Sequence, residues 1–212
     1  MADYTLHCFL ESGNAYKPAL MLELSGADWH AQWVDFIKGG EHRSPEFRAV
    51  NNMAEVPVLI DHTEGDLAIS QSGVILTHLA EKTDQFGAQT KAEEREILRW
   101  LLWDNHKFTG NISAYRFMAK FMGKGDTETA QNYKARMISA IKTLNAHLDG
   151  RDWVAADRPT IADISLIGYC TWPDHFDVIW SDYPNIEAWL QRMAALPNYK
   201  TPEDILPTGP TA

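Results

Sequence analysis

The chain has 212 residues, of which 45% are apolar and 23% are charged, and its formal net charge is −10. At about 150 residues per domain, this length and composition fit one large or two small globular domains and exclude disordered and collagen-like chains. The acidic balance argues against a nucleic-acid partner, because binding phosphates requires a surplus of Lys and Arg on some face. No apolar run approaches the roughly 20 residues that cross a bilayer, so no membrane partner is expected.

The first residues and the two cysteines indicate a reducing compartment. Residues 1–4 lack the basic and apolar regions of a signal peptide. Cys8 and Cys170 lie far apart and outside any C-x-x-C pair, and no group of Cys and His has zinc-ligand spacing. We therefore expect a cytoplasmic protein without a disulfide framework and without a metal.

Strand and helix patterns alternate over residues 1–82. Strands are predicted at residues 4–9, 33–37, 58–60 and 67–69. Helices are predicted with Pro18 in a first turn and a stop at Gly26, from Ser44 to Val50, and from a cap at Ser70 to Lys82. This order, β-α-β-α-β-β-α, predicts a small α/β layer.

A linker at residues 83–89 precedes a region without strand patterns. Residues 90–93 form a candidate capping box, and a helical stripe follows that ends at Gly150. The stripe consists of Tyr133, Met137, Ile141, Leu144 and Leu148. Thr160 and Asp163 open another helix, so residues 90–212 are predicted to form an all-helical domain.

Three short segments of the first domain carry groups that suit a peptide-like anion. Ser12 and Asn14 precede a helix whose N-terminus favours anions, although both residue types are also common in turns and caps. Val56 precedes Pro57 at a strand start, which fits either an ordinary turn or a cis bond that exposes the Val56 backbone to an extended ligand. Gln71 and Ser72 fit capture of a carboxylate or simple helix capping.

Five segments in this order carry a family resemblance: residues 12–17, 40–47, 51–57, 71–72 and 160–164. On these segments, nearly the whole chain resembles the cytosolic glutathione transferases of the Nu-like or theta- and phi-like serine type. The resemblance implies a thioredoxin-like glutathione-binding domain at residues 1–82 and an all-helical domain at residues 90–212. It also implies glutathione as co-substrate, no metal, and a homodimer.

The resemblance implies a role for each matching residue. Ser12 occupies the position of the hydroxyl that hydrogen-bonds the glutathione sulfur, and Asn14 lies near that sulfur in Nu-like members. The remaining residues implied to bind glutathione are Val56 with cis Pro57 at the cysteinyl unit, Gln71 and Ser72 at the γ-glutamyl end, and His42 at the glycyl carboxylate. Thr160 and Asp163 match a structural capping box, and removing either is expected to cost about 1 kcal/mol.

The second substrate, a small hydrophobic electrophile or a disulfide, is expected against the helical domain. Its predicted pocket residues are Trp103, His106, Tyr115 and Trp172, each of which also suits an aromatic core position. One residue departs from the family pattern, since Glu55 stands where Lys or Gln is common. A carboxylate there is predicted to repel the glycyl carboxylate unless Lys38, His42 or Arg43 compensates.

Three functions follow from these residues. The first is a glutathione transferase that stabilises the glutathione thiolate for attack on hydrophobic electrophiles. The second is a Nu-like, glutathione-dependent disulfide-bond oxidoreductase, which needs no protein cysteine. The third, motivated by Glu55, is a binding module that keeps the fold without turnover.

Overall fold

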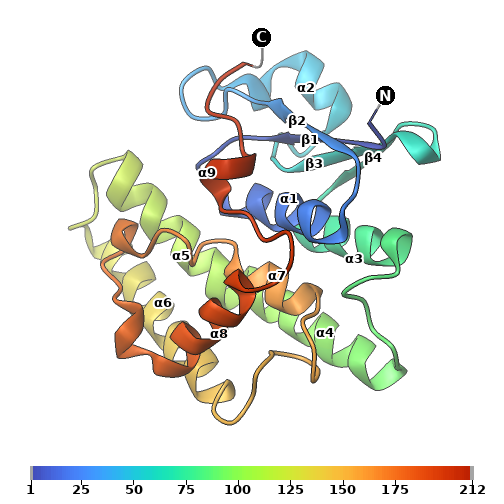
Figure 1. The fold of residues 1–212 in the computed structure, drawn as a ribbon. Helices are drawn as coiled ribbons and strands as arrows, with labels where there is room; N and C mark the ends of the chain where they lie inside the picture. The colour runs from blue at the N-terminus through green and yellow to red at the C-terminus, as the bar shows by residue number, and fades with distance from the viewer. Residues whose placement is uncertain (1, 211–212) are drawn as a thin grey trace. The chain divides into compact units, whose positions relative to one another are not determined.

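The computed structural model describes residues 2–210 and divides the chain into two compact units (Figure 1). The first unit joins the part up to Gln85 with the segment that starts at Pro197, and the second runs from Phe86 to Leu196. The predicted helical domain included the last segment. The structure places this segment on the first unit, where Leu10 N–H donates to Pro207 O at 3.0 Å and Tyr16 Oη–H donates to Lys200 O at 2.7 Å.

The first unit contains a four-stranded mixed sheet within the described residues. In the order β2-β1-β3-β4, its strands are Trp29–Trp33, Tyr4–Cys8, Val58–Asp61 and Leu67–Ser70. β1 is parallel to β2 and antiparallel to β3, which is antiparallel to β4. The prediction of β2 at residues 33–37 was wrong. The strand ends at Trp33, and the Asp35 carboxylate then accepts from the N–H groups of Lys38 and Gly39, which turns the chain.

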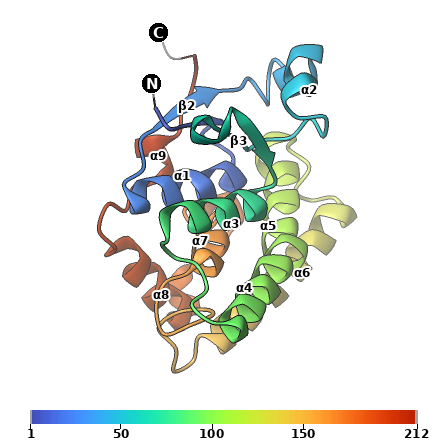
Figure 2. The ribbon, with the colours of Figure 1, turned by 90° about the vertical axis from the view of Figure 1, so that its right-hand side faces the viewer.

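Helices cover both faces of this sheet. Figures 1 and 2 show α1 (Gly13–Ser25) and α3 (Ser72–Thr83) on one face and α2 (Pro45–Val50) on the other. Phe47 of α2 packs with Val34 and Val58 in a buried cluster. The short helix α9 (Pro202–Ile205) contacts α1.

Two helix starts differ from the predictions. α1 begins at Gly13, ahead of Pro18, because Ser12 already caps it. Ser70 belongs to β4, and Gln71 takes the N-cap position of α3 without a side-chain capping bond. The predicted caps at Ser44 and Gly26 are confirmed.

The second unit is helical throughout the described residues. It contains α4 (Lys91–Trp103), α5 (Thr109–Arg116), α6 (Glu128–His147), α7 (Ile161–Ile167) and α8 (Pro184–Ala194). The π-helical turn Asp104–Phe108 joins α4 to α5. The predicted buried stripe is confirmed at Met137, Ile141, Leu144 and Leu148, whereas Tyr133 is only partly buried. In the described part of the chain, no helix combines the length and the apolar character needed to cross a membrane.

Asp163 organises the second unit from a fully buried position. One carboxylate oxygen accepts from Val154 N–H at 2.9 Å and from Trp189 Nε1–H at 3.0 Å. The other oxygen accepts from the N–H and hydroxyl of Thr160 at 2.9 and 3.1 Å, which confirms the predicted capping box. One side chain thereby joins the start of α7 to the preceding loop and to α8.

Candidate functional site

The strand directions gather the predicted site segments of the first unit at one end of the sheet. The parallel strands β1 and β2 end at Cys8 and Trp33, which are register partners. In the antiparallel pair, β3 begins at Val58 opposite Ser70, where β4 ends. The loops at these strand ends, together with the first turns of α1 and α3, carry Ser12, Asn14, His42, Val56, Pro57, Gln71 and Ser72. Because neighbouring strands lie about 4.8 Å apart, the sheet brings these loops into proximity.

Ser12 caps α1 through its hydroxyl oxygen and leaves its hydroxyl hydrogen unused. Its side chain is buried, and its Oγ accepts from Ala15 N–H at 3.1 Å. Among residues 2–210 the Ser12 hydroxyl hydrogen has no acceptor, and the N–H groups of Gly13 and Asn14 have none either. Unpaired amides at a helix N-terminus attract negative charge. The start of α1 therefore presents one hydroxyl donor and two amide donors for an anion.

Asn14 adds an acceptor beside these donors. Its Oδ1 is buried and has no hydrogen-bond partner within the described residues. An unpaired buried acceptor costs about 1–3 kcal/mol. A thiol or amide hydrogen of a bound molecule would remove this cost.

Cys8 and Tyr16, two other nucleophilic groups of the first unit, are buried. Burial raises the pKa of the Cys8 thiol to about 12, so the thiolate is absent near neutral pH. Tyr16 is fully buried and donates its hydroxyl hydrogen to Lys200 O, and burial raises its pKa. In the second unit, the buried thiol of Cys170 donates to Leu166 O at 3.3 Å. The two thiols and the Tyr16 phenol are thus held in buried positions, whereas the hydroxyl hydrogen of Ser12 has no acceptor among the described residues.

Val56 has an unpaired backbone N–H and an unpaired backbone C=O, which we call the Val56 peptide edge. The Val56–Pro57 bond is cis, and neither the N–H nor the C=O of Val56 forms a hydrogen bond with any residue in the described range 2–210. Val56 is partly exposed just before β3. An exposed N–H and C=O pair can bond to an extended peptide, as in strand addition. Sequence reasoning left this position open between a turn and a ligand contact.

A buried asparagine holds the loop that leads to Val56. Asn51 Nδ2 donates to Glu55 O at 2.7 Å, and Asn51 Oδ1 accepts from Met53 N–H at 3.1 Å. Ala54 has a φ of 54°, in the left-handed region that a non-glycine residue enters at a cost. Sequence reasoning did not identify Asn51 as a clamp, because its partners depend on the loop conformation.

Gln71 and Ser72 begin α3 next to this loop. Gln71 has a φ of 71°, and its Nε2 donates to Glu55 Oε2 at 2.8 Å. Ser72 is buried, whereas Gln71 and Glu55 are exposed. The Glu55–Gln71 hydrogen bond was not predicted, although the sequence did mark Glu55 as unusual.

His42 lies in an aromatic stack. Its ring is 3.9 Å from that of Phe36, which in turn stacks on Phe9 at 4.9 Å. Nε2 of His42 accepts from Arg43 Nε–H at 3.1 Å, and its Nδ1 is buried without a partner in the described residues. Burial and the nearby Arg43 and Arg48 guanidinium groups lower the pKa of His42. The ring is therefore neutral near pH 7, and Nδ1–H is its remaining donor.

The lowered pKa of His42 predicts a loss of stability in mild acid. The imidazole of the unfolded chain has a pKa of about 6.5, so it binds a proton at a higher pH than the imidazole of the folded chain. The free energy of unfolding therefore falls as the pH falls below about 6.5. We expect His42→Phe, measured by urea unfolding between pH 7 and 5, to reduce this slope. The slope does not vanish, because burial also lowers the pKa of His7.

The matched control for His42 is His30→Gln, a change at an exposed position on the edge strand β2. It is expected to leave the slope unchanged. Equal slopes for wild type and both variants would contradict the assignment of this pH dependence to His42.

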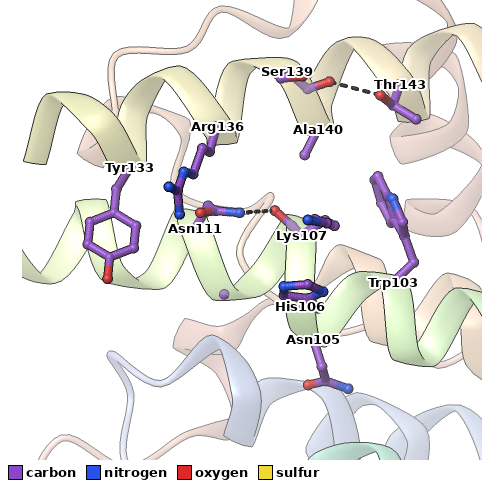
Figure 3. Close-up of a pocket in the computed structure, with 11 residues that line it drawn as sticks. Trp103, Asn105, His106, Lys107, Asn111, Tyr133, Arg136, Ser139, Ala140 and Thr143 are labelled. Carbon is purple, nitrogen blue, oxygen red and sulfur yellow. Dashed lines mark hydrogen bonds between the residues drawn. The ribbon is translucent and has the colours of Figure 1, made fainter.

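The second unit contains a cavity of about 780 Å³ over α4, α5 and α6 (Figure 3). Trp103 and His106, two of the predicted pocket residues, line it. The other lining residues are Asn105, Lys107, Gly110, Asn111, Tyr133, Arg136, Ser139, Ala140 and Thr143. Trp103 and Tyr133 contribute aromatic rings to this cavity, Lys107 and Arg136 contribute positive charges, and the lining includes no carboxylate. It therefore suits an aromatic molecule that carries a negative charge.

Part of the lining comes from the π-helical turn Asp104–Phe108, a local geometry that is frequent at functional sites. Sequence reasoning missed Lys107 and Arg136. Both residues are exposed and lie outside the buried apolar stripes of their helices. This position was the one signal in the sequence that could have pointed to them.

The other two predicted pocket residues lie elsewhere in the second unit. Tyr115 is buried, and its hydroxyl donates to Asp177 Oδ2 at 3.4 Å. The Arg116 guanidinium lies 4.5 Å from the centre of the Trp172 ring, and Arg116 Nε–H donates to His175 Nδ1 at 3.0 Å. The structure thus separates Tyr115 and Trp172 from the cavity lined by Trp103 and His106.

One cluster in the described residues has ligand atoms close enough to hold a metal. Asp61, Glu64 and His78 each place one such atom within 4.8 Å of the others. The Lys82 ammonium is 2.6 Å from Glu64 and 3.7 Å from Asp61, and His78 Nε2 is 2.7 Å from Asp61. The Lys82 ammonium and the His78–Asp61 hydrogen bond already connect these three side chains.

Comparison with known proteins connects this arrangement to a family. Residues 12–82 match the model of the glutathione S-transferase N-terminal domain, and residues 108–197 match that of the C-terminal domain. A crystal structure of a possible glutathione S-transferase from Rhodopseudomonas palustris is 32% identical, with a TM-score of 0.87, and covers 95% of this chain and 98% of its own. The chain belongs to the glutathione S-transferase superfamily. The predicted fold class, a thioredoxin-like unit combined with a helical unit, is thereby confirmed.

This glutathione S-transferase homologue also resembles proteins that are not named as transferases. Disulfide-bond oxidoreductase YfcG of Escherichia coli (strain K12) is 28% identical over 203 residues, which is 89% of each chain. Protein URE2 of Eremothecium gossypii is 28% identical over 239 residues, and the match covers 93% of this chain but 66% of that relative. A structure of Ure2p in complex with glutathione is 26% identical, has a TM-score of 0.85, and covers 93% of this chain and 96% of its own.

Proposed function

We propose that this chain is a glutathione transferase in which Ser12 stabilises the thiolate of bound glutathione. The observation that carries the proposal is the state of Ser12, which is buried at the start of α1 with its hydroxyl hydrogen uncommitted among the described residues. The N–H groups of Gly13 and Asn14 reinforce a negative charge at the same place. Support also comes from Ure2p, a structural relative solved with glutathione.

The remaining binding residues follow the shape of the tripeptide. The Val56 peptide edge bonds to the cysteinyl unit, with Pro57 cis. Gln71 and Ser72 hold the γ-glutamyl end, and Asn14 lies by the sulfur. The Nδ1–H of His42, with the adjacent Arg43 guanidinium, supplies donors for the glycyl carboxylate.

The reaction needs no protein nucleophile. The glutathione thiol releases its proton to solvent, and Ser12 donates a hydrogen bond to the resulting thiolate. The sulfur then forms a bond to an electrophilic carbon, and the leaving group departs with the electrons of the broken bond. We assign the second substrate to the helical unit, at the cavity that Trp103 and His106 line.

A disulfide-bond oxidoreductase activity is the second candidate, and the similarity to YfcG favours it. In this reaction a glutathione thiolate attacks one sulfur of a disulfide substrate and releases the other as a thiolate. A second glutathione then attacks the mixed disulfide, which yields glutathione disulfide and the reduced substrate. The buried Cys8 and Cys170 leave both steps to glutathione.

The protein is proposed to be a cytoplasmic homodimer. Leu98 and Leu102 are exposed one turn apart on α4 and support self-association, because a contiguous exposed apolar patch is a feature of protein interfaces. Two free, buried cysteines fit a reducing compartment.

Calorimetric titration with glutathione tests the proposal, combined with ultraviolet titration of the thiolate in the complex. We expect binding, with a thiol pKa about 2 units below that of free glutathione. The Cys8→Ala/Cys170→Ala variant is expected to retain turnover with electrophilic or disulfide substrates. No detectable binding at millimolar glutathione would contradict both enzyme functions and favour a binding module that recognises another partner.

A further inference from the structure

The γ-glutamyl end of glutathione carries two opposite charges, an α-carboxylate and an α-ammonium. Gln71 and Ser72 supply an amide N–H, a hydroxyl and the first backbone N–H groups of α3, all of which suit the carboxylate. Neither residue brings a formal negative charge. An ammonium group bonds best to an ionised acceptor, because charge-assisted hydrogen bonds are about twice as strong as neutral ones. An ionised acceptor for the ammonium would therefore come from another residue.

Glu55 is placed to be that acceptor. Its Oε2 accepts from Gln71 Nε2 at 2.8 Å, so the carboxylate lies beside the start of α3. The side chain is exposed, and no Lys, Arg or His within residues 2–210 forms an ion pair with it. By contrast, Asp61 at the end of β3 and Glu64 in the turn that follows are both paired with Lys82. The charge of Glu55 thus remains available to a ligand.

The backbone holds this carboxylate next to the peptide edge. Asn51 Nδ2 bonds to Glu55 O at 2.7 Å, and Val56, with its unpaired peptide groups, follows directly in the chain. A tripeptide whose cysteinyl unit pairs with Val56 has its γ-glutamyl end toward Gln71, where the Glu55 side chain points. The sequence had led us to expect Glu55 to repel the glycyl carboxylate. Its bond to Gln71 instead places it at the opposite end of the ligand.

We propose that Glu55 accepts the α-ammonium of the γ-glutamyl residue and thereby selects ligands with a free amino group at this end. Gln71 orients the Glu55 carboxylate through its amide, and Ser72 with the first amides of α3 takes the α-carboxylate. This assignment rests on the proposed glutathione site.

The experiment compares two ligands by calorimetry, glutathione and glutaryl-cysteinyl-glycine, which lacks only the α-ammonium. Glu55→Gln preserves the shape and removes the charge. We expect it to weaken glutathione binding roughly 10- to 100-fold and to leave the affinity for the glutaryl analogue unchanged. The wild-type protein is expected to bind the analogue more weakly than glutathione by a similar factor.

Two further variants complete the test. Glu46→Gln removes one exposed negative charge from α2 and is expected to change neither affinity. Glu55→Gln/Gln71→Glu exchanges the two hydrogen-bonded side chains, so that the carboxylate stands at position 71 and the amide at position 55. This double variant is expected to restore much of the glutathione affinity. The inference is overturned if Glu55→Gln binds glutathione as wild type does, or if both ligands weaken equally. If the wild-type protein does not bind glutathione at all, the proposed function itself fails.

Discussion

Ser12→Ala is expected to lower glutathione-dependent turnover roughly 10- to 100-fold while the protein remains folded. The substitution removes the Ser12 hydroxyl from the start of α1 and leaves the backbone amides of Gly13 and Asn14 in place. Steady-state kinetics with an electrophilic aryl substrate gives the turnover. Ultraviolet titration of the enzyme–glutathione complex gives the pKa of the thiol, which is expected to rise toward its free value.

The magnitude follows from the thiol's ionisation. A thiol with a pKa of about 8.5 is only ~3% ionised at pH 7, and lowering the pKa by ~2 units requires ~2.7 kcal/mol. A hydrogen bond to a charged acceptor contributes about 1.5–3 kcal/mol, and a helix N-terminus about 0.3–1 kcal/mol. The hydroxyl of Ser12 and the start of α1 together suffice. A much lower pKa would weaken the nucleophile, since the best attacking thiol has a pKa near the ambient pH.

Ser44 provides a matched control for the loss of a helix cap. It caps α2 as Ser12 caps α1, and its Oγ accepts from Phe47 N–H at the same distance of 3.1 Å. Ser44→Ala is expected to cost similar stability, about 1 kcal/mol, without moving the thiol pKa. Ser12→Thr, which keeps the hydroxyl, is expected to restore turnover. If Ser12→Ala has the turnover and the thiol pKa of the wild-type protein, the role of Ser12 is limited to capping α1.

Asp163→Ala is expected to cost about 3–5 kcal/mol of the free energy of unfolding, measured by chemical denaturation. The substitution leaves three backbone or indole donors, on Val154, Thr160 and Trp189, without their buried acceptor. Burial raises the pKa of Asp163, and the hydrogen bonds from Val154, Thr160 and Trp189 oppose this rise. From the sequence alone, a cost of about 1 kcal/mol was expected for an ordinary cap.

The second capping box of the chain supplies the control. Asp204 accepts from the N–H and hydroxyl of Thr201 in the same pattern as Asp163 from Thr160, but it is exposed. Asp204→Ala is expected to be much less destabilising, because water replaces the lost acceptor. Comparable losses for the two variants would show that capping, and not burial of the network, sets the cost at Asp163.

Local patterns predicted most of the fold. Strong turn and cap residues such as Ser44, Gly26 and Thr160 marked helix ends that the structure confirms. Strand β2 was misplaced because the alternation at residues 33–37 was weak, while pairing with β1 decided where the strand lies. Such pairing is a tertiary effect that the strand's own residues do not encode.

The candidate site was predictable residue by residue but not in its contacts. Ser12, Val56 and Gln71 could be named from turn chemistry and resemblance. The Glu55–Gln71 hydrogen bond joins residues 16 positions apart, so no local pattern reveals it. The burial of His42 against Phe36 likewise depends on how the loop after β2 folds back.

The C-terminal segment on the first unit bears on how that unit can be produced in isolation. A fragment that stops at Gln85 would strip the Tyr16 phenol of its acceptor on Lys200 and the Leu10 amide of its acceptor on Pro207. Synthesising residues 197–210 as a free peptide and adding it back, or splicing it behind Gln85 through a glycine tether, would supply both acceptors in trans or in cis. The first unit is thus built from two segments that are separated in the sequence, and the helical unit is inserted between them.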